Sequence, residues 1–139
     1  MRAYVFPATL SEPYPNDFVV RFPDVPEAIT GGATPQEALA NAVEALEVAI
    51  EHYLDLGLPV PTPRAAGLGE HPVALAPAVA ARAMLVETMA AQKLSKVALA
   101  ERMGRDEKVV RRAVSGKGAS LDLILAALRA AGVNPALAV

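Results

Sequence analysis

The side chains that usually perform catalysis or bind metals are sparse in this sequence and form no catalytic pattern. The chain has two histidines and no cysteine, and neither His52 nor His71 has a second His or Cys at zinc-ligand spacing. Asp17 and Asp24 flank an expected strand, but two-metal hydrolysis needs several carboxylates that converge on ions about 4 Å apart. Four serines lie at expected turns or caps with no His/Asp partner indicated: Ser11, Ser95, Ser115 and Ser120. With no phosphate-binding loop, we expect no enzyme activity, no metal site and no cofactor.

A different chemistry is indicated within residues 95–117, where basic side chains recur. Lys108, Arg111 and Arg112 lie on the outward side of an expected helix. Ammonium and guanidinium groups arranged in this way bind DNA phosphates and base edges. The alternative is an ordinary helical hairpin whose basic residues lie on a solvated face. The spacing of the neighbouring residues favours DNA binding over that alternative.

Two short helices joined by a tight turn are expected to position these basic residues. Ser95 caps the first helix, and Gly104 supplies the left-handed corner that the turn needs. Ala100 lies four residues before Gly104 and Val110 six residues after it, which suits the packing of two steeply crossing helices. The second helix is expected to begin near Asp106 and to lie in a DNA major groove.

Two further helices are expected to complete a four-helix domain. Pro77 opens a helix that runs to about Ala91, and Ser120 caps a final helix that Gly132 ends. The apolar side of the helix from Pro77 consists of Val79, Ala83, Val86 and Ala90. That of the helix capped by Ser95 consists of Val97, Leu99, Ala100 and Met103, and that of the final helix consists of Leu121, Leu125 and Leu128.

The first half of the chain predicts a small antiparallel sheet. Residues 2–10 and 17–22 alternate between apolar and polar and are expected to form a hairpin, with a turn over residues 12–17. Residues 27–33 are expected to form a short third strand that ends in two glycines. Residues 73–75 would return as the last strand.

A long helix is expected between the third and the last strand. Thr34 caps this helix, Pro35 takes its first position and Glu37 closes a capping box. The helix runs to about Leu56 and stops at Gly57. Its apolar stripe, which must cover the sheet, consists of Leu39, Val43, Leu46, Ile50 and Tyr53.

The two halves of the chain carry opposite charge. Residues 1–77 hold three basic and ten acidic side chains, a net charge of −7, whereas residues 78–139 hold ten basic and five acidic ones, a net charge of +5. This suggests nucleic acid as the partner of the basic half and a basic partner for the acidic half. We therefore predict two domains, 1–76 and 77–139, with a Pro/Gly-rich connection at 57–72.

Composition also bounds the compartment. A chain without cysteine fits a reducing cytoplasm, which is the localisation that we expect. No apolar run is long enough to span a bilayer, so we expect no membrane partner. The first residues alternate around Pro7 and do not resemble a signal peptide.

The acidic half resembles the HicB antitoxin family in two segments, DFVVRFPDVPEAITGGATPQEALANAVEAL and the proline-rich VPTPR. The basic half resembles the helix-turn-helix subset of that family in PAVAARAMLVETMAAQKLSKVALAERMGRDEKVVRRAV. These segments cover most of the chain in the expected order. The pattern FPD-x-P-x-x-x-T-x-G before a capped helix is fairly specific, whereas a helix-turn-helix pattern alone is widespread.

The resemblance implies an α+β protein with two jobs. The N-terminal domain would be a partial RNase H-like β-β-β-α-β unit that binds and blocks a small basic mRNA-cleaving toxin of the HicA type. The C-terminal domain would be an all-α helix-turn-helix unit that binds operator DNA and represses its own operon. The chain would act as a dimer or a higher even oligomer.

Site residues follow from the resemblance and from the charge pattern. The DNA-contacting positions are Asp106, Glu107, Lys108, Arg111 and Arg112, together with the neighbouring Lys96, Arg105 and Lys117. Asp106 and Glu107 place negative charge at the start of the second helix, where helix capping is the alternative role. The toxin-binding positions are Glu37, Glu44, Glu47, Glu51 and Asp55, for each of which a solvated acidic face is the alternative.

A second function remains open at this stage. The chain could be a transcriptional regulator whose N-terminal domain senses a small molecule. A basic protein that co-purifies with the chain would favour the antitoxin, and a bound metabolite would favour the sensor.

Overall fold

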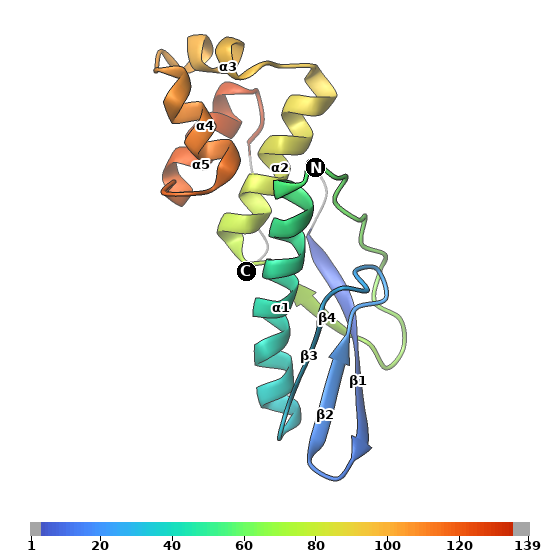
Figure 1. Ribbon diagram of the computed structural model, residues 1–139. Helices are drawn as coiled ribbons and strands as arrows, with labels where there is room; N and C mark the ends of the chain where they lie inside the picture. Colours follow the sequence, from blue (N-terminus) through green and yellow to red (C-terminus); the bar gives the residue numbers. More distant parts are fainter. Residues whose placement is uncertain (1–3, 135–139) are drawn as a thin grey trace. The chain divides into compact units, whose positions relative to one another are not determined.

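An antiparallel sheet with one long helix is followed by four shorter helices in the computed structural model, which describes residues 4–134 (Figure 1). The chain divides into two compact units, here called the N-terminal unit, which ends at Ala76, and the C-terminal unit, which begins at Pro77. The predicted α+β class and the predicted order of three strands, a helix and a last strand are both confirmed.

Four strands form the sheet of the N-terminal unit. They are β1 (Val5–Tyr14), β2 (Asp17–Arg21), β3 (Ile29–Gly32) and β4 (His71–Ala74). Their order across the sheet is β3-β2-β1-β4, and each neighbouring pair is antiparallel. The last strand in sequence therefore pairs with the first, and β3 and β4 are the two edges.

The first strand is longer than predicted. It continues to Tyr14, so the expected turn over residues 12–17 was wrong except at its tip, where Asn16 adopts a left-handed φ of 59°. The register of β1 against β2 is irregular between Ser11 and Tyr14. Pro13 lies in this irregular stretch, where a residue without an N–H group interrupts no regular ladder.

The long helix α1 (Pro35–Asp55) packs against β2 and β3. Its N-cap is Thr34, whose hydroxyl accepts a hydrogen bond from the backbone N–H of Glu37 at 3.1 Å. Leu46 and Ile50 are fully buried, as predicted.

The centre of the buried face of α1 differs from the predicted stripe. Leu39, Val43 and Tyr53 are only half-buried, and the remaining buried positions are Ala38, Ala42, Ala49 and Leu54. Three of these are alanines, whose small side chains allow the helix backbone to approach the sheet closely. Leu46 and Ile50 share this buried face with the alanines.

The C-terminal unit consists of α2 (Pro77–Gln92), α3 (Lys96–Met103), α4 (Glu107–Ser115) and α5 (Leu121–Ala130). Local capping explains most of these boundaries. The hydroxyls of Ser95 and Ser120 accept hydrogen bonds from backbone N–H groups in the first turns of α3 and α5. Gly104 and Gly116 end α3 and α4 with left-handed φ angles of 64° and 73°, a conformation that glycine adopts without penalty.

The predicted core of the helical unit is shifted at several positions. Val97 is 52% exposed, because the eight-residue helix α3 is buried through Leu99 and Ala100. In α2, Ala90 is exposed and Met89 is buried instead. In α5, Leu121 and Leu125 are half-buried, and the fully buried positions are Ile124, Ala127 and Leu128.

Candidate functional site

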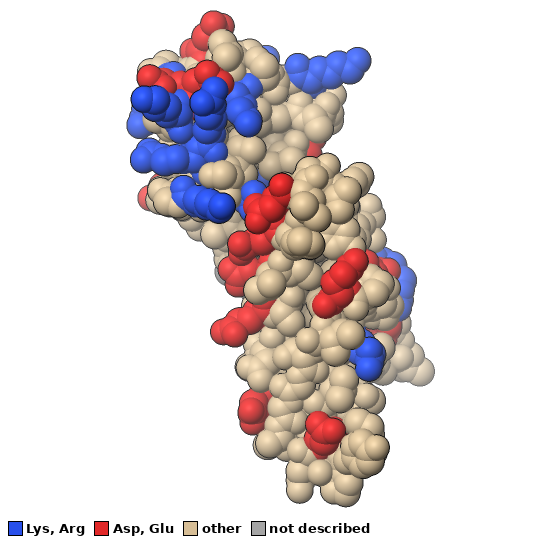
Figure 2. Space-filling model, viewed as in Figure 1, with Lys and Arg blue, Asp and Glu red and all other residues tan. Residues whose placement is uncertain are grey.

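A basic surface covers the α3–α4 part of the C-terminal unit. The six basic residues predicted to contact DNA are all exposed: Lys96, Arg105, Lys108, Arg111, Arg112 and Lys117. We call this set the basic face. Figure 2 shows Lys and Arg side chains gathered on this unit with a few acidic ones among them. Arg102, in the last turn of α3, is also exposed and was not among the predicted residues.

The helix α4 presents its basic residues outward because its apolar residues hold its other side in the core. Val110 and Ala113 are fully buried, whereas Lys108, Arg111 and Arg112 are exposed. The turn before α4 contains Gly104, Arg105 and Asp106, so α3 and α4 are separated by three residues.

The C-terminal end of α4 is held by an arginine that sequence reasoning missed. Arg82 of α2 is only 6% exposed, and its Nε donates a hydrogen bond of 2.6 Å to the backbone carbonyl of Val114. The following Gly116 lies against the same side chain, since a Cβ there would stand 3.0 Å from the Arg82 Cδ. An arginine in a helix is normally expected at the surface. The contact of Arg82 with the end of α4 is therefore evident only from its buried position in the structure.

The two acidic residues at the start of α4 have structural partners. Asp106 is the N-cap, and its carboxylate accepts a hydrogen bond of 2.9 Å from the backbone N–H of Lys108. Glu107 forms an ion pair with Arg111, one helical turn later, at 3.0 Å. The Arg111 guanidinium is therefore already engaged by a carboxylate of the same helix.

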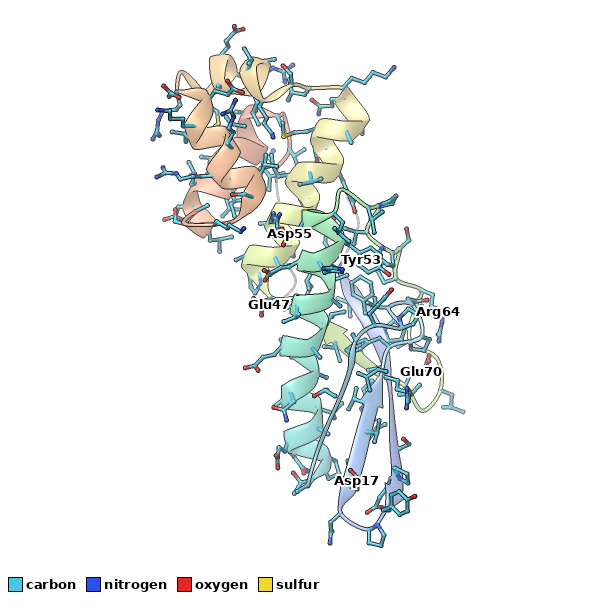
Figure 3. The ribbon with its side chains drawn as sticks, in the orientation of Figure 1. Asp17, Glu47, Tyr53, Asp55, Arg64 and Glu70 are labelled. Carbon is cyan, nitrogen blue, oxygen red and sulfur yellow. The ribbon has the colours of Figure 1, made fainter. Side chains whose placement is uncertain are left out.

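The predicted toxin-binding acids lie along α1. Glu37, Glu44 and Asp55 are exposed, and Glu47 and Glu51 are half-buried. Their spacing of three, four and seven residues places them along one side of the helix. Figure 3 shows Glu47 and Asp55 projecting from α1.

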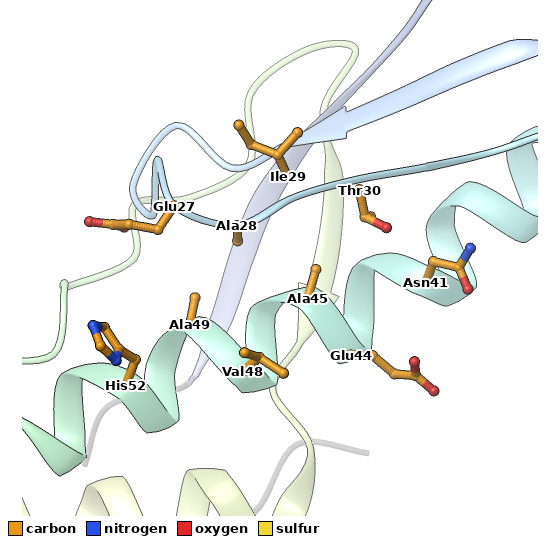
Figure 4. Close-up of a pocket in the computed structure, with 10 residues that line it drawn as sticks. All are labelled: Glu27, Ala28, Ile29, Thr30, Asn41, Glu44, Ala45, Val48, Ala49 and His52. Carbon is orange, nitrogen blue, oxygen red and sulfur yellow. The ribbon is translucent and has the colours of Figure 1, made fainter.

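A groove with an apolar floor lies between β3 and α1. Its volume is about 510 Å³, and its lining residues are Glu27, Ala28, Ile29, Thr30, Asn41, Glu44, Ala45, Val48, Ala49 and His52. Ile29 and Val48 are 51% and 70% exposed. In Figure 4, Ala45 and Ala49 face the strand, Glu27 and His52 lie at one end of the groove, and Asn41 and Glu44 lie at the other.

A polar network fixes the connection between α1 and β4. The Arg64 guanidinium donates two hydrogen bonds, of 2.7 and 2.6 Å, to the Glu70 carboxylate, which also accepts one from the Gly67 backbone at 2.7 Å. These donors lower the pKa of Glu70 to about 2. The backbone N–H of Arg64 donates to Asp24 at 3.2 Å, which ties the connection to the segment after β2.

The polar residues first considered for catalysis or metal binding are not brought together. Asp24 contacts Arg64, and Asp17 begins β2. His52 lies at the groove and His71 begins β4. Among residues 4–134, no three His, Cys, Asp or Glu side chains are grouped as a metal ion would require.

Comparison with known proteins identifies the family. A family model described as "HicB_like antitoxin of bacterial toxin-antitoxin system" matches residues 5–84, which is more than half of the chain. The chain belongs to the HicB-like antitoxin family. Membership implies a toxin as the partner of this antitoxin.

Curated relatives agree with this assignment. The chain is 38% identical over 116 residues to "Antitoxin HicB 2" of Photorhabdus laumondii, a match that covers 83% of this chain and 82% of the relative. "Antitoxin HicB 1" of the same organism is 36% identical over 77% of this chain and 68% of its own length. "Antitoxin HicB" of Escherichia coli K12 is 28% identical over 77% and 78%.

The matches to the HicB-like family extend over residues of both units. The family model spans the whole sheet and α1 and ends within α2. An alignment of 116 residues is longer than the N-terminal unit, so part of the helical unit of this antitoxin is also shared. No described helix of the antitoxin is both long and apolar enough to cross a membrane.

Proposed function

We propose that this HicB-like antitoxin neutralises a small basic mRNA-cleaving toxin of the HicA type with its N-terminal unit, and represses its own operon with its C-terminal unit. The observation that carries the proposal is the division of charge, a net −7 over residues 1–77 and a net +5 over residues 78–139. A protein that grips RNA is basic, so an acidic surface attracts it and competes with its substrate. The same acidic surface repels nucleic acid.

The C-terminal unit supports a helix-turn-helix role. Helices α3 and α4 flank a turn that begins at Gly104. The small residue Ala100 and the larger Val110 are both buried, and they occupy the positions expected at the contact of such a helix pair. Helix α4, which carries Lys108, Arg111 and Arg112 of the basic face, would then be the recognition helix in the major groove. A dimer or a higher even oligomer would present two such helices to two operator half-sites.

The N-terminal unit supports a partial RNase H-like fold. Its β-β-β-α-β order carries a sheet with one long helix packed against β2 and β3. With no grouped metal-binding side chains among the described residues, we expect this unit to bind protein and to leave RNA intact. The cytoplasm is the compartment in which such an antitoxin meets its toxin and its operator.

A transcriptional regulator that senses a small molecule is the weaker alternative function. The groove volume of about 510 Å³ lies within the range of small-molecule sites. Such sites bury most of their ligand, however, and this groove leaves Ile29 and Val48 at least half exposed. An open groove of this kind suits a protein partner better.

Operator binding is tested with the full-length antitoxin and its own promoter DNA. Affinity should fall steeply as salt rises, because bound phosphates release counterions. Arg112→Ala should cost about 1–3 kcal/mol of binding free energy if it reads a base. Arg129→Ala, which removes a basic residue outside the basic face, is the matched control. An Arg111/Arg112 double variant that binds the operator normally would contradict the assignment.

Toxin neutralisation is tested by mRNA cleavage. The toxin encoded beside this gene should cleave mRNA alone and stop when the antitoxin is added in equal amounts. A toxin that stays active at saturating antitoxin would refute this half of the proposal.

A further inference from the structure

We propose that the groove between β3 and α1 is the docking site for an apolar side chain of the toxin, which enters between flanking basic residues of that toxin. This inference rests on the proposed antitoxin function and names the contact surface within it. It differs from a purely electrostatic contact on the acidic side of α1, because the centre of the interface is then apolar.

The groove exists because small residues line its floor. Ala28 comes from the segment before β3, and Ala45 and Ala49 come from α1. A larger residue at any of these positions would fill the space between strand and helix. The small residues leave a hollow of about 510 Å³, which is enough for a large aliphatic or aromatic side chain.

Two large aliphatic side chains border this hollow without being buried. Ile29 at the edge strand is 51% exposed, and Val48 on α1 is 70% exposed. Burying a side chain of this size against a partner favours association, because its apolar surface leaves water. Both residues line the groove, but the Ile29 side chain lies on the side of β3 away from α1 (Figure 4). A partner side chain that enters the groove would therefore cover Val48.

The charges around the groove indicate what that partner is. Glu27 and His52 lie at one end of the groove and Glu44 at the other (Figure 4). The Glu27 carboxylate is held in place by the Tyr53 hydroxyl, which donates to it at 2.8 Å. A partner with an apolar side chain between Lys or Arg residues would match this order of acidic, apolar and acidic groups.

A second copy of this chain is a poorer occupant. A symmetric pairing through the groove would bring the two α1 helices, each with several acidic residues, close to one another. Each N-terminal half carries a net charge of −7, and like charges that meet across an interface weaken it. A basic partner gains from the same charges.

The remaining acids of α1 then form the polar rim of the interface. Stable interfaces have a well-packed apolar centre surrounded by polar residues that exclude water and contribute less to affinity. Glu37, Glu47 and Glu51 lie along the helix that borders the groove. We therefore assign the centre of the interface to the groove and a steering role to these acids.

The experiment compares two opposite charges at one exposed position. Full-length Val48→Lys and Val48→Glu antitoxins are immobilised, and toxin association and dissociation are measured. Val48→Lys should weaken toxin binding at least about 100-fold, mainly through faster dissociation, since it removes an anchor contact and adds repulsion. Val48→Glu should weaken it only about tenfold. Leu68→Lys, at a fully exposed leucine outside the groove, should leave binding unchanged.

A second variant tests the hollow itself. Ala45→Phe fills the groove from the helix side and should weaken toxin binding about as much as Val48→Lys. Circular dichroism and thermal unfolding establish that each variant is folded. If the Val48 substitutions unfold the chain, Glu44→Lys, an exposed change at the rim, replaces them and should weaken binding about tenfold.

The outcomes separate this inference from the proposed function. A wild-type antitoxin that does not inhibit the toxin would overturn both. Inhibition that survives Val48→Lys and Ala45→Phe unchanged would overturn the groove and leave the antitoxin function standing. A Val48→Lys change that alters only the oligomeric state, measured by light scattering, would show that a second copy occupies the groove and would also overturn the inference.

Discussion

Asp106 and Glu107 place two negative charges at the start of α4, the helix that we propose binds DNA. The structure gives both of them partners within the same helix. Asp106 satisfies a backbone N–H group that would otherwise lack an intrahelical acceptor. Glu107 holds the Arg111 guanidinium, which is 62% exposed and 3.0 Å from the Glu107 carboxylate. In the proposed operator complex, the carboxylate of Glu107 would therefore compete with DNA phosphate for Arg111.

Removing that competition should strengthen operator binding. An exposed ion pair one helical turn apart is worth about 0.3–0.5 kcal/mol, and the Glu107 carboxylate also repels phosphate. Glu107→Gln should therefore tighten operator binding about two- to fivefold at low salt, measured by fluorescence anisotropy. Asp122→Asn removes an exposed charge in the first turn of α5, outside the basic face, and serves as control. Equal tightening by both variants would mean that only net charge matters.

Glu70 should make the N-terminal unit less stable as the pH becomes acidic. The pKa of Glu70 is lowered from 4.5 to about 2. The hydrogen bond from Arg64 is the largest cause, and the hydrogen bond from the Gly67 N–H group is the second. A lowered pKa in the folded state contributes stability above the unfolded value of 4.5, and this contribution is lost as the pH falls towards 2.

The matched variant is Glu70→Gln, which cannot ionise. The wild type should be more stable than Glu70→Gln at neutral pH, and the difference should shrink between about pH 4.5 and 2. Thermal unfolding of both proteins over this range measures the difference. A difference that stays constant with pH would mean that the Arg64 contact does not depend on the Glu70 charge.

At the scale of elements, two glycines allow β3 to approach its neighbours. A Cβ on Gly31 would lie 2.5 Å from the Phe18 carbonyl oxygen in β2, and one on Gly32 would lie 2.6 Å from the Ala38 nitrogen in α1. Neither neighbour is a flexible side-chain end. The pair of glycines is thus needed because β3 is in close contact with backbone on two sides.

Gly31→Ala should therefore loosen β3. We expect a loss of about 1–3 kcal/mol in unfolding free energy, the usual cost of overpacking, and faster amide hydrogen exchange in residues 29–32. Gly57→Ala is the control, since Gly57 has a φ of +68° and nothing within 4 Å of the added Cβ. It should destabilise the chain without loosening β3 specifically. Unchanged exchange in Gly31→Ala would contradict the close contact.

Local signals explain which elements were predictable. Thr34, Ser95, Ser120 and Gly104 act through their own turns, and the helix ends that they imply agree with the structure to within a residue or two. The burial of Ala38 and Ala42 in place of Leu39 and Val43 depends on how closely α1 approaches the sheet. That distance is a tertiary property, which periodicity alone does not contain.

The candidate sites divide in the same way. The exposure of Lys108, Arg111 and Arg112 followed from helical periodicity. The groove did not, because its lining comes from two separate segments, the region of β3 and helix α1, which meet only in the folded chain. Arg82 was missed because nothing adjacent in sequence marks its carbonyl partner, 32 residues away.

At the scale of the whole molecule, the sheet sets where the chain can be divided. β4 pairs with β1 from Val5↔Ala74 to Ala8↔His71, and the Leu75 N–H group donates to the Tyr4 carbonyl at 2.8 Å. A cut within the Pro/Gly-rich connection therefore removes a strand and exposes the edge of β1. A cut after Ala76 keeps the N-terminal unit complete.

Fragment 1–76 should unfold cooperatively and inhibit the toxin, whereas fragment 1–63 should do neither. Fragment 77–139 should bind operator DNA, with the salt dependence of the intact chain, and leave the toxin active. Calorimetry and the cleavage assay measure these properties. If 1–76 folds but only the full-length chain inhibits, the C-terminal unit contributes to the toxin site or to the active assembly.

The pairing of β4 with β1 also has a consequence for synthesis. A ribosome that has translated β4 still has 56 residues to add before α5 is complete at Ala130. At about 5–20 residues per second, this takes about 3–11 s, and domains generally fold as units with the N-terminal one first. The nascent chain would therefore be able to capture toxin before it can occupy an operator. In each newly made molecule, toxin binding would thus become possible before operator binding.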